Sequence, residues 1–259
     1  MRSENNFLPK IITGEQVHVY CLAVTLQNPS ALDRSTRFLS PEELTTTGKF
    51  HFQKDRNRFI ASHSLLRVLI GSYLDCDPAL LEFSHNSYGK PLLMMKRVFD
   101  PIYFNMSGSG DRAAYAFTRL GEIGIDIEKM CQDFATEEVA EKFFSDHEVS
   151  VFRSLPESDK IEAFYNCWTR KEAFIKAVGE GLSYPLKDFD VSLRPGEPAK
   201  LLRIRGDAEE ASRWTLHEIP VAAGYKAAFA IRAKYLEVKI YNEEVVNSIL
   251  LSNNLTKSG

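Results

Sequence analysis

Three short apolar stretches, each separated from the next by a few turn-forming residues, constrain the fold of this chain most strongly. They cover residues 102–106, 113–118 and 123–128, and glycine-containing turns lie between them at 107–111 and 120–122. Stretches of this length are typical of β-strands, and connections this short join antiparallel neighbours. The sequence therefore predicts an antiparallel meander in the middle of the chain.

Helix-like patterns lie on both sides of these strands. Residues 53–74 and 160–178 carry apolar side chains at three- and four-residue spacing, which is typical of helices with one buried face. Further strands are expected at residues 17–26 and 225–231, which are mostly apolar. The order of these segments predicts an α+β protein.

The two halves of the chain have a similar order of strands and helices. The alternation of alanine with aromatic residues at 113–117 is repeated at 227–230. The repeat is short, but with the shared element content it favours two similar lobes, each an antiparallel sheet packed with helices. We expect an N-terminal lobe over residues 1–129 and a C-terminal lobe over residues 130–259.

The composition narrows the classes of protein to which the chain can belong. Its 259 residues carry a formal net charge of -3, whereas a general nucleic-acid binder normally has a basic excess. No stretch approaches the roughly 20 apolar residues that cross a bilayer, and the polar N-terminus lacks the apolar core of a signal peptide. The cysteines are scattered without a metal-binding pattern, which favours reduced thiols. We therefore expect a cytoplasmic protein without nucleic-acid or membrane partners.

Two carboxylates lie on the last of the three central strands. Side chains alternate along a strand, so Ile125 and Ile127 face one side while Asp126 and Glu128 face the other. This pattern is typical of a strand with one buried and one solvated face. It is found less often in a magnesium site, which it would also suit because Mg²⁺ prefers carboxylate oxygens together with the phosphates of a substrate. The spacing alone leaves both interpretations open.

A charged face runs along the helix expected at 160–178. Trp168, Glu172 and Lys176 are spaced by four residues and therefore lie along one side of it. A glutamate and a lysine at this spacing usually form a surface ion pair worth about 0.3–0.5 kcal/mol. In the functional alternative, Glu172 supplies a third carboxylate to a metal ion and Lys176 supplies an ammonium group to a phosphate.

Other basic and small residues give weaker signals. Lys90 lies in a Gly-Lys-Pro turn, while Arg58 and Arg67 lie on the helix at 53–74, where solvated or paired side chains are the usual interpretation. The turn at 107–111 offers backbone N–H groups that can cradle a phosphate, although most such turns only connect strands. The chain contains no Walker A loop, Rossmann glycine fingerprint, HExxH motif or serine-hydrolase elbow.

In combination, these segments resemble the 4′-phosphopantetheinyl transferases of the long, two-lobed type that activates surfactin synthetase. The resemblance extends over residues 17–231, and its most specific parts are GIDIE at 124–128 and WTRKEAFIKA at 168–177. The other matching segments are residues 58–67, 88–91, 104–107, 164–182 and 224–226.

The resemblance implies a site at the junction of two lobes related by a pseudo-twofold axis. It implies a Mg²⁺ ion held by Asp126, Glu128 and Glu172, with Lys176 in contact with the phosphates of coenzyme A. It also assigns residues of both lobes to coenzyme A binding, namely Arg58, Lys90, Ser107, Gly108, Asp126 and Lys176.

The implied activity is that of a holo-[acyl-carrier-protein] synthase. Such an enzyme transfers the 4′-phosphopantetheine group of coenzyme A to a serine of an apo acyl or peptidyl carrier protein and releases 3′,5′-ADP. Mg²⁺ and Lys176 stabilise the charge that develops on the diphosphate, and Glu172, directly or through water, is the candidate base for the serine proton. Because one chain supplies both halves of the site, we expect a monomer.

One position departs from the pattern of the family. The resemblance predicts, after Ser107, a histidine that contacts the 3′-phosphate of coenzyme A, and Gly108 stands there instead. The basic residues expected within 43–47 are also missing. We therefore expect weaker discrimination for the 3′-phosphate than in relatives. A non-catalytic relative that binds coenzyme A or a carrier protein, and an unrelated Mg²⁺-dependent phosphate enzyme, are the alternatives.

Overall fold

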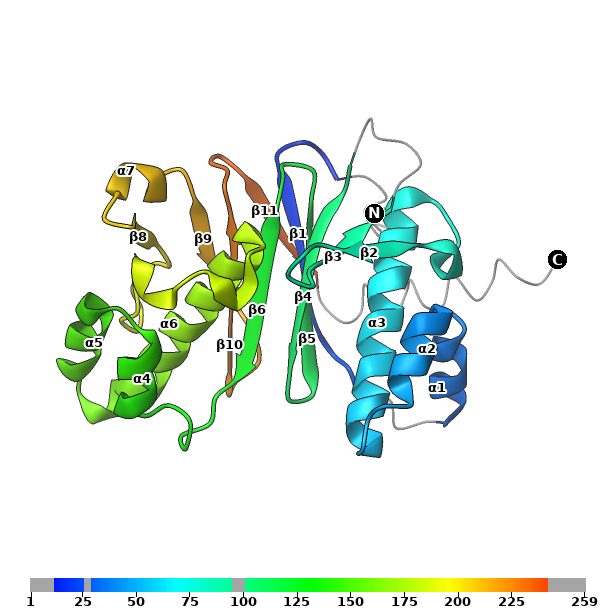
Figure 1. The fold of residues 1–259 in the computed structure, drawn as a ribbon, viewed down its shortest axis with the longest axis horizontal. Helices are drawn as coiled ribbons and strands as arrows, with labels where there is room; N and C mark the ends of the chain where they lie inside the picture. The colour runs from blue at the N-terminus through cyan, green and yellow to red at the C-terminus, as the bar shows by residue number, and fades with distance from the viewer. Residues whose placement is uncertain (1–11, 26–28, 95–100, 242–259) are drawn as a thin grey trace, which may run out of the picture.

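The structure, a computed structural model, describes residues 12–25, 29–94 and 101–241. Two sheets lie at its centre and helices lie on their outer sides (Figure 1). The strands are β1 (Gln16–Ala23), β2 (Phe83–His85), β3 (Pro91–Leu93), β4 (Tyr103–Ser109), β5 (Arg112–Thr118), β6 (Ile123–Lys129), β7 (Phe189–Val191), β8 (Leu201–Ile204), β9 (Thr215–Glu218), β10 (Tyr225–Ile231) and β11 (Glu237–Tyr241). The helices are α1 (Pro29–Thr36), α2 (Pro41–Thr47), α3 (Gln53–Leu74), α4 (Glu137–Phe143), α5 (Asp146–Arg153), α6 (Glu157–Val178) and α7 (Ala208–Ala211), with 3₁₀ helices η1 (Pro78–Leu80), η2 (Gly181–Ser183) and η3 (Leu186–Asp188). The predicted α+β class is confirmed.

The first sheet has the strand order β11-β1-β5-β4, and α3 packs on its outer face. β4 and β5 form the antiparallel hairpin that the sequence predicts, and β5 also pairs antiparallel with β1. Tyr115 and Phe117 of β5 share a core with Leu66 and Leu69 of α3. Ala116, which lies between them in the sequence, belongs to a different core. The alternation along one strand therefore supplies two cores on opposite faces.

The second sheet has the strand order β6-β10-β9, and α6 packs on its outer face. Ala228 and Ala230 of β10 lie in the core beneath the helix, together with Phe164 and Phe174 of α6. The small side chains of the strand leave room for the aromatic side chains of the helix. α6 ends at Gly179, whose φ of 81° is the left-handed conformation that glycine adopts readily.

A third core lies between the two sheets and contains residues of both halves of the chain. Val17 and Val19 of β1 meet Ile125 and Ile127 of β6 and Phe229 of β10 in this core. All five side chains have 0% exposure, so the predicted buried face of β6 is confirmed. The molecule is therefore built in four layers: α3, the first sheet, the second sheet and α6 (Figure 1).

The predicted meander is wrong at its third strand. β6 follows the β4–β5 hairpin in the sequence, but it pairs with β10 rather than with β5. β11 makes the converse exchange, because it follows the second half of the chain and pairs in parallel with β1. Each sheet therefore contains a strand from the other half. The lobe boundary expected after residue 129 stays a prediction.

The similarity of the two halves extends to their topology. The repeated alanine and aromatic pattern lies on β5 and β10, and each of these is the middle strand of an antiparallel triple, β1-β5-β4 and β9-β10-β6. The helices that cover the two sheets, α3 and α6, each contain 22 residues. The predicted two-lobed organisation is consistent with this arrangement.

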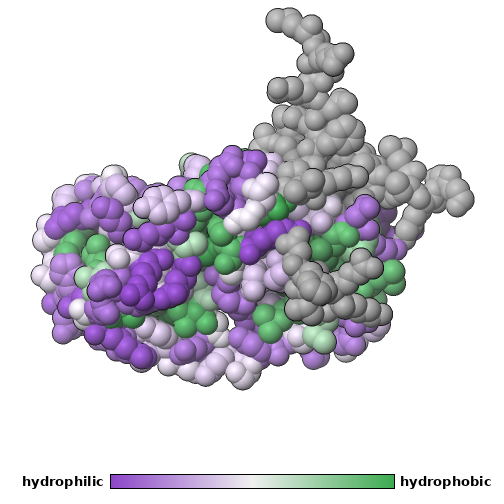
Figure 2. All heavy atoms as spheres, turned by 90° about the horizontal axis from the view of Figure 1, so that it is seen from above, coloured by the Kyte–Doolittle hydropathy of each residue, from purple (hydrophilic) through white to green (hydrophobic). Residues whose placement is uncertain are grey.

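The polarity of the surface and the state of the cysteines match the expectations from the composition. Polar and charged residues cover most of the face seen from above, and apolar residues appear there in small groups (Figure 2). All four cysteines are free, as the sequence predicts. Among the described residues, no helix combines the length and the apolar character that a membrane crossing requires.

Candidate active site

The carboxylates of β6 face α6, on the side opposite the core between the sheets. Asp126 is only 2% exposed, which excludes the solvated-face interpretation for this residue. Glu128 lies two residues further along the same face and is partly buried. The GIDIE segment therefore contributes Asp126 and Glu128 to a polar site beside a helix, and the magnesium-site interpretation of the pattern stays a prediction.

Gly124 brings the backbone of α6 against β6. A Cβ at this position would overlap the backbone oxygen of Ala173 and the backbone nitrogen of Ala177. Only glycine permits so close an approach, because it has no side chain. The contacted backbone runs from Ala173 to Ala177, so it includes Lys176 and directly follows Glu172, and both residues lie close to the strand that carries Asp126.

Asp126 is the centre of a polar cluster that joins both halves of the chain. Lys176 of α6 donates from Nζ to Asp126 Oδ1 at 2.6 Å and to Ser107 Oγ at 2.9 Å. Ser107 of β4 donates in turn to Asp126 Oδ1 at 2.8 Å. Within the described residues, the second carboxylate oxygen, Oδ2, is buried and has no hydrogen-bond partner.

Burial and mutual repulsion perturb the two glutamates beside Asp126. Desolvation, followed by the charge of Asp126, raises the pKa of Glu128 to about 7, although Ser109 Oγ donates to its Oε2 at 2.6 Å. The same two causes raise the pKa of Glu172. Perturbed carboxylates that gather around a buried one are typical of functional sites. The three acidic side chains therefore create a region that favours a positive charge.

The donors at this site fit a hard cation. An unpartnered buried polar atom costs about 1–3 kcal/mol, and a divalent ion coordinated by oxygen would satisfy Asp126 Oδ2. As the side chains stand, no three His, Cys, Asp or Glu residues in the described part of the chain are grouped to hold a metal ion. The assignment of Asp126, Glu128 and Glu172 as magnesium ligands therefore stays a prediction.

A pocket of about 300 Å³ lies between α3 and the β4–β5 hairpin, and we call it the α3 pocket. Arg58 and Phe59 line it from α3, and Gly108 and Gly110 line it from the hairpin. Arg58 donates to the carbonyl oxygen of Gly110 and pairs with Asp55. Two of the residues assigned to coenzyme A are thus brought together. The remaining lining residues are Val24, Phe50, Asp55, Ser62, Ser109, Arg112 and Ala113.

Lys90 contacts residues next to the start of β6, and its assignment to the nucleotide stays a prediction. Its Nζ pairs with Glu122 at 2.5 Å and donates to the carbonyl oxygen of Ile123 at 3.2 Å. Asn86, in the same turn, donates to the carbonyl oxygen of Gly179 at 2.9 Å. The turn therefore connects the start of β6 with the end of α6, and Lys90 does not line the α3 pocket.

Two polar residues of β4 were not identified from the sequence. Asn105 Oδ1 accepts from the N–H of Ile125 at 2.9 Å, and Ser109 contacts Glu128 as described. With Ser107 they form an alternating polar series on one face of β4. The spacing of two residues was the signal that the sequence offered. In the structure these three side chains contact β6, so the β4 edge of the first sheet lies along β6.

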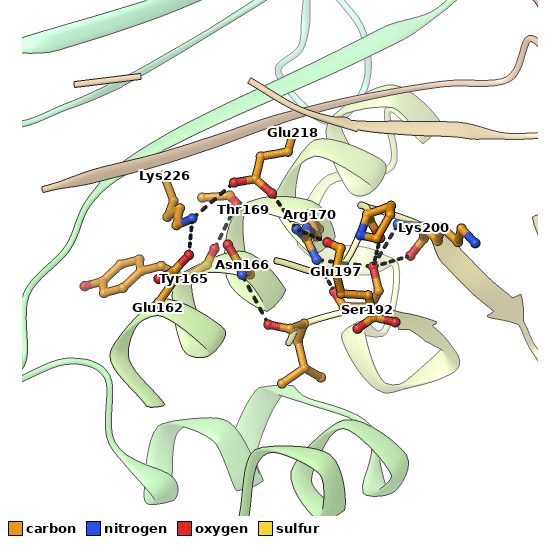
Figure 3. Close-up of polar contacts among 12 residues, drawn as sticks. Glu162, Tyr165, Asn166, Thr169, Arg170, Ser192, Glu197, Lys200, Glu218 and Lys226 are labelled. Carbon is orange, nitrogen blue, oxygen red and sulfur yellow. Dashed lines mark hydrogen bonds and ion pairs between the residues drawn. The ribbon is translucent and has the colours of Figure 1, made fainter. Parts of the chain in front are cut away.

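Arg170 and Lys171, in the most specific motif, are buried structural residues. Arg170 donates to the carbonyl oxygen of Ser192 and to Glu218, each at 2.8 Å (Figure 3). Lys171 pairs with Glu148 at 2.7 Å in the core beneath α6. These contacts hold α6 against its sheet, so the charged residues of the motif divide into structural ones and the two that face Asp126.

Comparison with known proteins identifies the family. Residues 122–230 match the 4′-phosphopantetheinyl transferase superfamily, and residues 27–119 match the family described as 4′-phosphopantetheinyl transferase, N-terminal. Over 232 residues the chain is 33% identical to the 4′-phosphopantetheinyl transferase HetI of Nostoc sp., which covers 88% of this chain and 94% of that relative. The chain belongs to the 4′-phosphopantetheinyl transferase family.

This transferase is also similar to members from other organisms. It is 35% identical over 161 residues to the 4′-phosphopantetheinyl transferase Sfp of Bacillus subtilis, covering 62% of this chain and 69% of that one. It is 28% identical over 213 residues to the L-aminoadipate-semialdehyde dehydrogenase-phosphopantetheinyl transferase of Homo sapiens, covering 76% and 68% of the two chains. The family and the enzyme class inferred from the motifs are confirmed.

Proposed function

We propose that the protein transfers the 4′-phosphopantetheine group of coenzyme A to a serine of an apo acyl or peptidyl carrier protein. The reaction depends on Mg²⁺ and releases 3′,5′-ADP. The observation that carries the proposal is the environment of Asp126, a buried carboxylate with one unpartnered oxygen and a lysine of the opposite half on the other. A site of this kind suits a cation that binds a diphosphate.

Asp126, Glu128 and Glu172 are the proposed ligands of Mg²⁺. When bound, the ion neutralises charge on the diphosphate of coenzyme A. Lys176 lies within 2.6 Å of Asp126 and is partly exposed, so its ammonium group can also reach a phosphate at the mouth of the site. Its positive charge then stabilises the oxygen that leaves with 3′,5′-ADP.

Glu172 is the proposed base for the serine of the carrier protein. Burial and the neighbouring Asp126 charge raise the pKa of Glu172, which makes this carboxylate a stronger proton acceptor than an ordinary one. The proton passes to Glu172 directly or through one water molecule. The serine oxygen forms its bond to the phosphorus that bears pantetheine, and the bond from that phosphorus to the departing phosphate breaks.

The α3 pocket is the proposed site for the nucleotide end of coenzyme A. Its volume of about 300 Å³, its aromatic residues Phe50 and Phe59 and the guanidinium of Arg58 suit a base and a phosphate. Ser107 lies on the strand between this pocket and Asp126, where a diphosphate would connect the two.

Lys90 is assigned to the nucleotide by resemblance alone. The monomeric state and the cytoplasmic location also stay predictions.

The test is incubation of an apo carrier protein with the enzyme, coenzyme A and Mg²⁺. A gain of about 340 Da, the mass of the phosphopantetheine group, is expected on the carrier serine, since the transfer is a displacement at phosphorus. Asp126→Ala and Glu172→Ala should each reduce turnover by about 100-fold or more, because each removes a charge from the proposed metal site.

The matched control is Glu138→Ala, which removes an exposed carboxylate of α4 and should leave turnover unchanged. Unmodified carriers from fatty-acid, polyketide and nonribosomal-peptide systems alike would contradict the proposed activity. Normal turnover in folded Asp126→Ala or Glu172→Ala would contradict the assigned site while leaving the activity intact.

A further inference from the structure

Tyr225, the first residue of β10, contacts the tip of the β4–β5 hairpin in the other sheet. Its hydroxyl donates to Asp111 Oδ1 at 2.5 Å and accepts from the N–H of Asp111 at 3.2 Å. We propose that Tyr225 is a positioning residue that holds this hairpin, and with it one side of the α3 pocket, in the geometry that binds coenzyme A. The inference rests on the proposed function, and it explains a motif residue that has no part in the chemistry.

The hairpin tip is shaped around the tyrosine hydroxyl. Gly110 has a φ of 60°, and a Cβ there would overlap the Tyr225 hydroxyl, so glycine is required on both counts. The carbonyl oxygen of Asp111 accepts from the N–H of Val24 at 2.8 Å, and that of Gly110 accepts from Arg58. From the second sheet, β6 contacts this tip through Glu128 and Lys129 at Ser109, and β10 contacts it through the Tyr225 hydroxyl at Asp111.

The same hairpin connects the pocket to the carboxylates. Gly108, Ser109 and Gly110 line the α3 pocket, while the Ser109 hydroxyl donates to Glu128 on the other side of the strand. Tyr225 is paired with Lys129 in the β10–β6 register, directly beside Glu128. A shift of the hairpin would therefore move the pocket relative to the carboxylates, and Tyr225 opposes that shift.

Lys226 fixes the backbone from which Tyr225 extends. It faces the opposite side of β10, where its Nζ bonds to Glu162 at 2.7 Å and to Glu218 at 3.1 Å (Figure 3). Arg170 of α6 bonds to the same Glu218 at 2.8 Å. The start of β10 is thus attached to the helix that carries Glu172. The Tyr225 hydroxyl is consequently held at a defined place relative to the site.

The principal experiment measures kinetics and hydrogen exchange of Tyr225→Phe, which removes only the hydroxyl. The KM for coenzyme A should rise about 3- to 10-fold, as expected for lost hydrogen bonds that preorganise a site, and kcat should stay within about twofold. The amides of residues 107–112 should exchange faster than in the wild type. Asp111→Ala should reproduce both effects, and the double variant should be no worse than either single one.

Tyr73→Phe is the matched control, because its hydroxyl also makes two hydrogen bonds, to His18 and Tyr20. It should lower the melting temperature and leave the KM for coenzyme A unchanged. An unchanged KM in Tyr225→Phe, a fall confined to kcat, or unchanged exchange at residues 107–112 would overturn the proposal. If the wild type transfers nothing to any carrier, the proposed function fails, and hydrogen exchange alone decides whether Tyr225 holds the hairpin.

Discussion

At the scale of single residues, Glu128 shows how burying carboxylates close together beside α6 lowers the stability of the fold. Its pKa of about 7 in the folded chain lies above the ordinary value of 4.5, because the ionised form is desolvated and repelled by Asp126. A raised carboxyl pKa contributes stability that is present below the unfolded-state pKa and is lost as the pH rises through about 7. At pH 8 the folded protein therefore holds an unfavourable charge that a cation would offset.

Glu128→Gln should stabilise the metal-free protein at pH 8. We expect an increase of about 1 kcal/mol in the free energy of unfolding, after allowance for screening by solvent. The increase should shrink below pH 7, where Glu128 of the wild type becomes protonated. Thermal unfolding with and without Mg²⁺ measures both parts of the prediction: the ion should raise the melting temperature of the wild type much more than that of the variant. Equal stabilisation of both by Mg²⁺ would place the ion elsewhere.

Gly108 is the second residue whose substitution is informative. A Cβ added at Gly108 would lie 3.5 Å from the carbonyl oxygen of Arg112, which is an ordinary contact distance. A side chain therefore fits at this position without displacing the strand. Glu43, in the segment expected to be basic, pairs with the buried Arg67 at 2.7 Å and offers nothing to a phosphate. The pairing of Glu43 agrees with weak recognition of the 3′-phosphate, and the space at Gly108 allows the missing histidine to be introduced there.

Gly108→His should increase the preference for coenzyme A over dephospho-coenzyme A. An added hydrogen bond to a charged phosphate corresponds to about a tenfold gain in the ratio of kcat/KM for the two donors. Steady-state kinetics with both donors measure this ratio in the wild type and in the variant. An unchanged ratio, in a variant that retains turnover with coenzyme A, would show that position 108 does not contact the 3′-phosphate.

At the scale of elements, β6 and α6 show what the sequence can and cannot predict. Periodicity identified both elements, and it placed Asp126 opposite the buried isoleucines and Glu172 on the same side of the helix as Lys176. It did not identify the partner of β6, because a strand pattern specifies which face is buried and not which strand lies beside it. Pairing with β10, about 100 residues later, is decided by tertiary packing.

The roles of individual charged residues were equally unpredictable from spacing. Arg170 and Lys171 are charged residues of the kind that usually lies on the surface of a helix, yet each is only 1% exposed. Their partners, Ser192 and Glu148, lie on other segments of the chain. The motif as a whole identified the family because both its catalytic candidates and its structural residues are present. Sequence alone does not separate these two groups.

The contact between β6 and α6 predicts a large effect of Gly124→Ala. The added methyl group would overlap the backbone of α6, which must then move away and take Glu172 and Lys176 with it. We expect a loss of about 3 kcal/mol or more in the free energy of unfolding, at the upper end of overpacking effects, together with a strong loss of transfer activity. Chemical denaturation measures the first quantity and the carrier assay the second.

Gly14→Ala provides the matched control for this substitution. No atom lies within 4 Å of a Cβ built at Gly14, so this variant should be nearly as stable and as active as the wild type. A stable and active Gly124→Ala enzyme would contradict the proposed dependence of the site on the closeness of helix and strand.

At the scale of the whole molecule, His18 joins elements from both ends of the described chain. It has 0% exposure on β1, bonds to Tyr73 of α3 at 2.8 Å and packs against Tyr241 of β11. Burial, followed by the charge of Lys239, lowers its pKa to about 4, and Glu237 acts in the opposite direction. The folded protein therefore holds His18 neutral, and its protonation opposes the docking of β11.

The linkage predicts acid sensitivity with a defined window. Because the folded-state pKa lies below the ordinary 6.5, stability is fully present above about pH 6.5 and is lost as the pH falls toward 4. The contribution of His18 is about 2–3 kcal/mol over this range. His18→Gln should flatten this part of the pH profile of unfolding, measured by urea denaturation at several pH values. A profile of the same steepness in the variant would assign the acid sensitivity to other groups.

The exchange of β6 and β11 between the sheets has a consequence for biosynthesis. β1 leaves the ribosome more than 200 residues before its parallel neighbour β11. This edge of β1 therefore lacks its partner strand until β11 has been synthesised, and exposed strand edges promote association with other chains. Chaperone capture of the nascent protein should accordingly persist until residues 237–241 have been released.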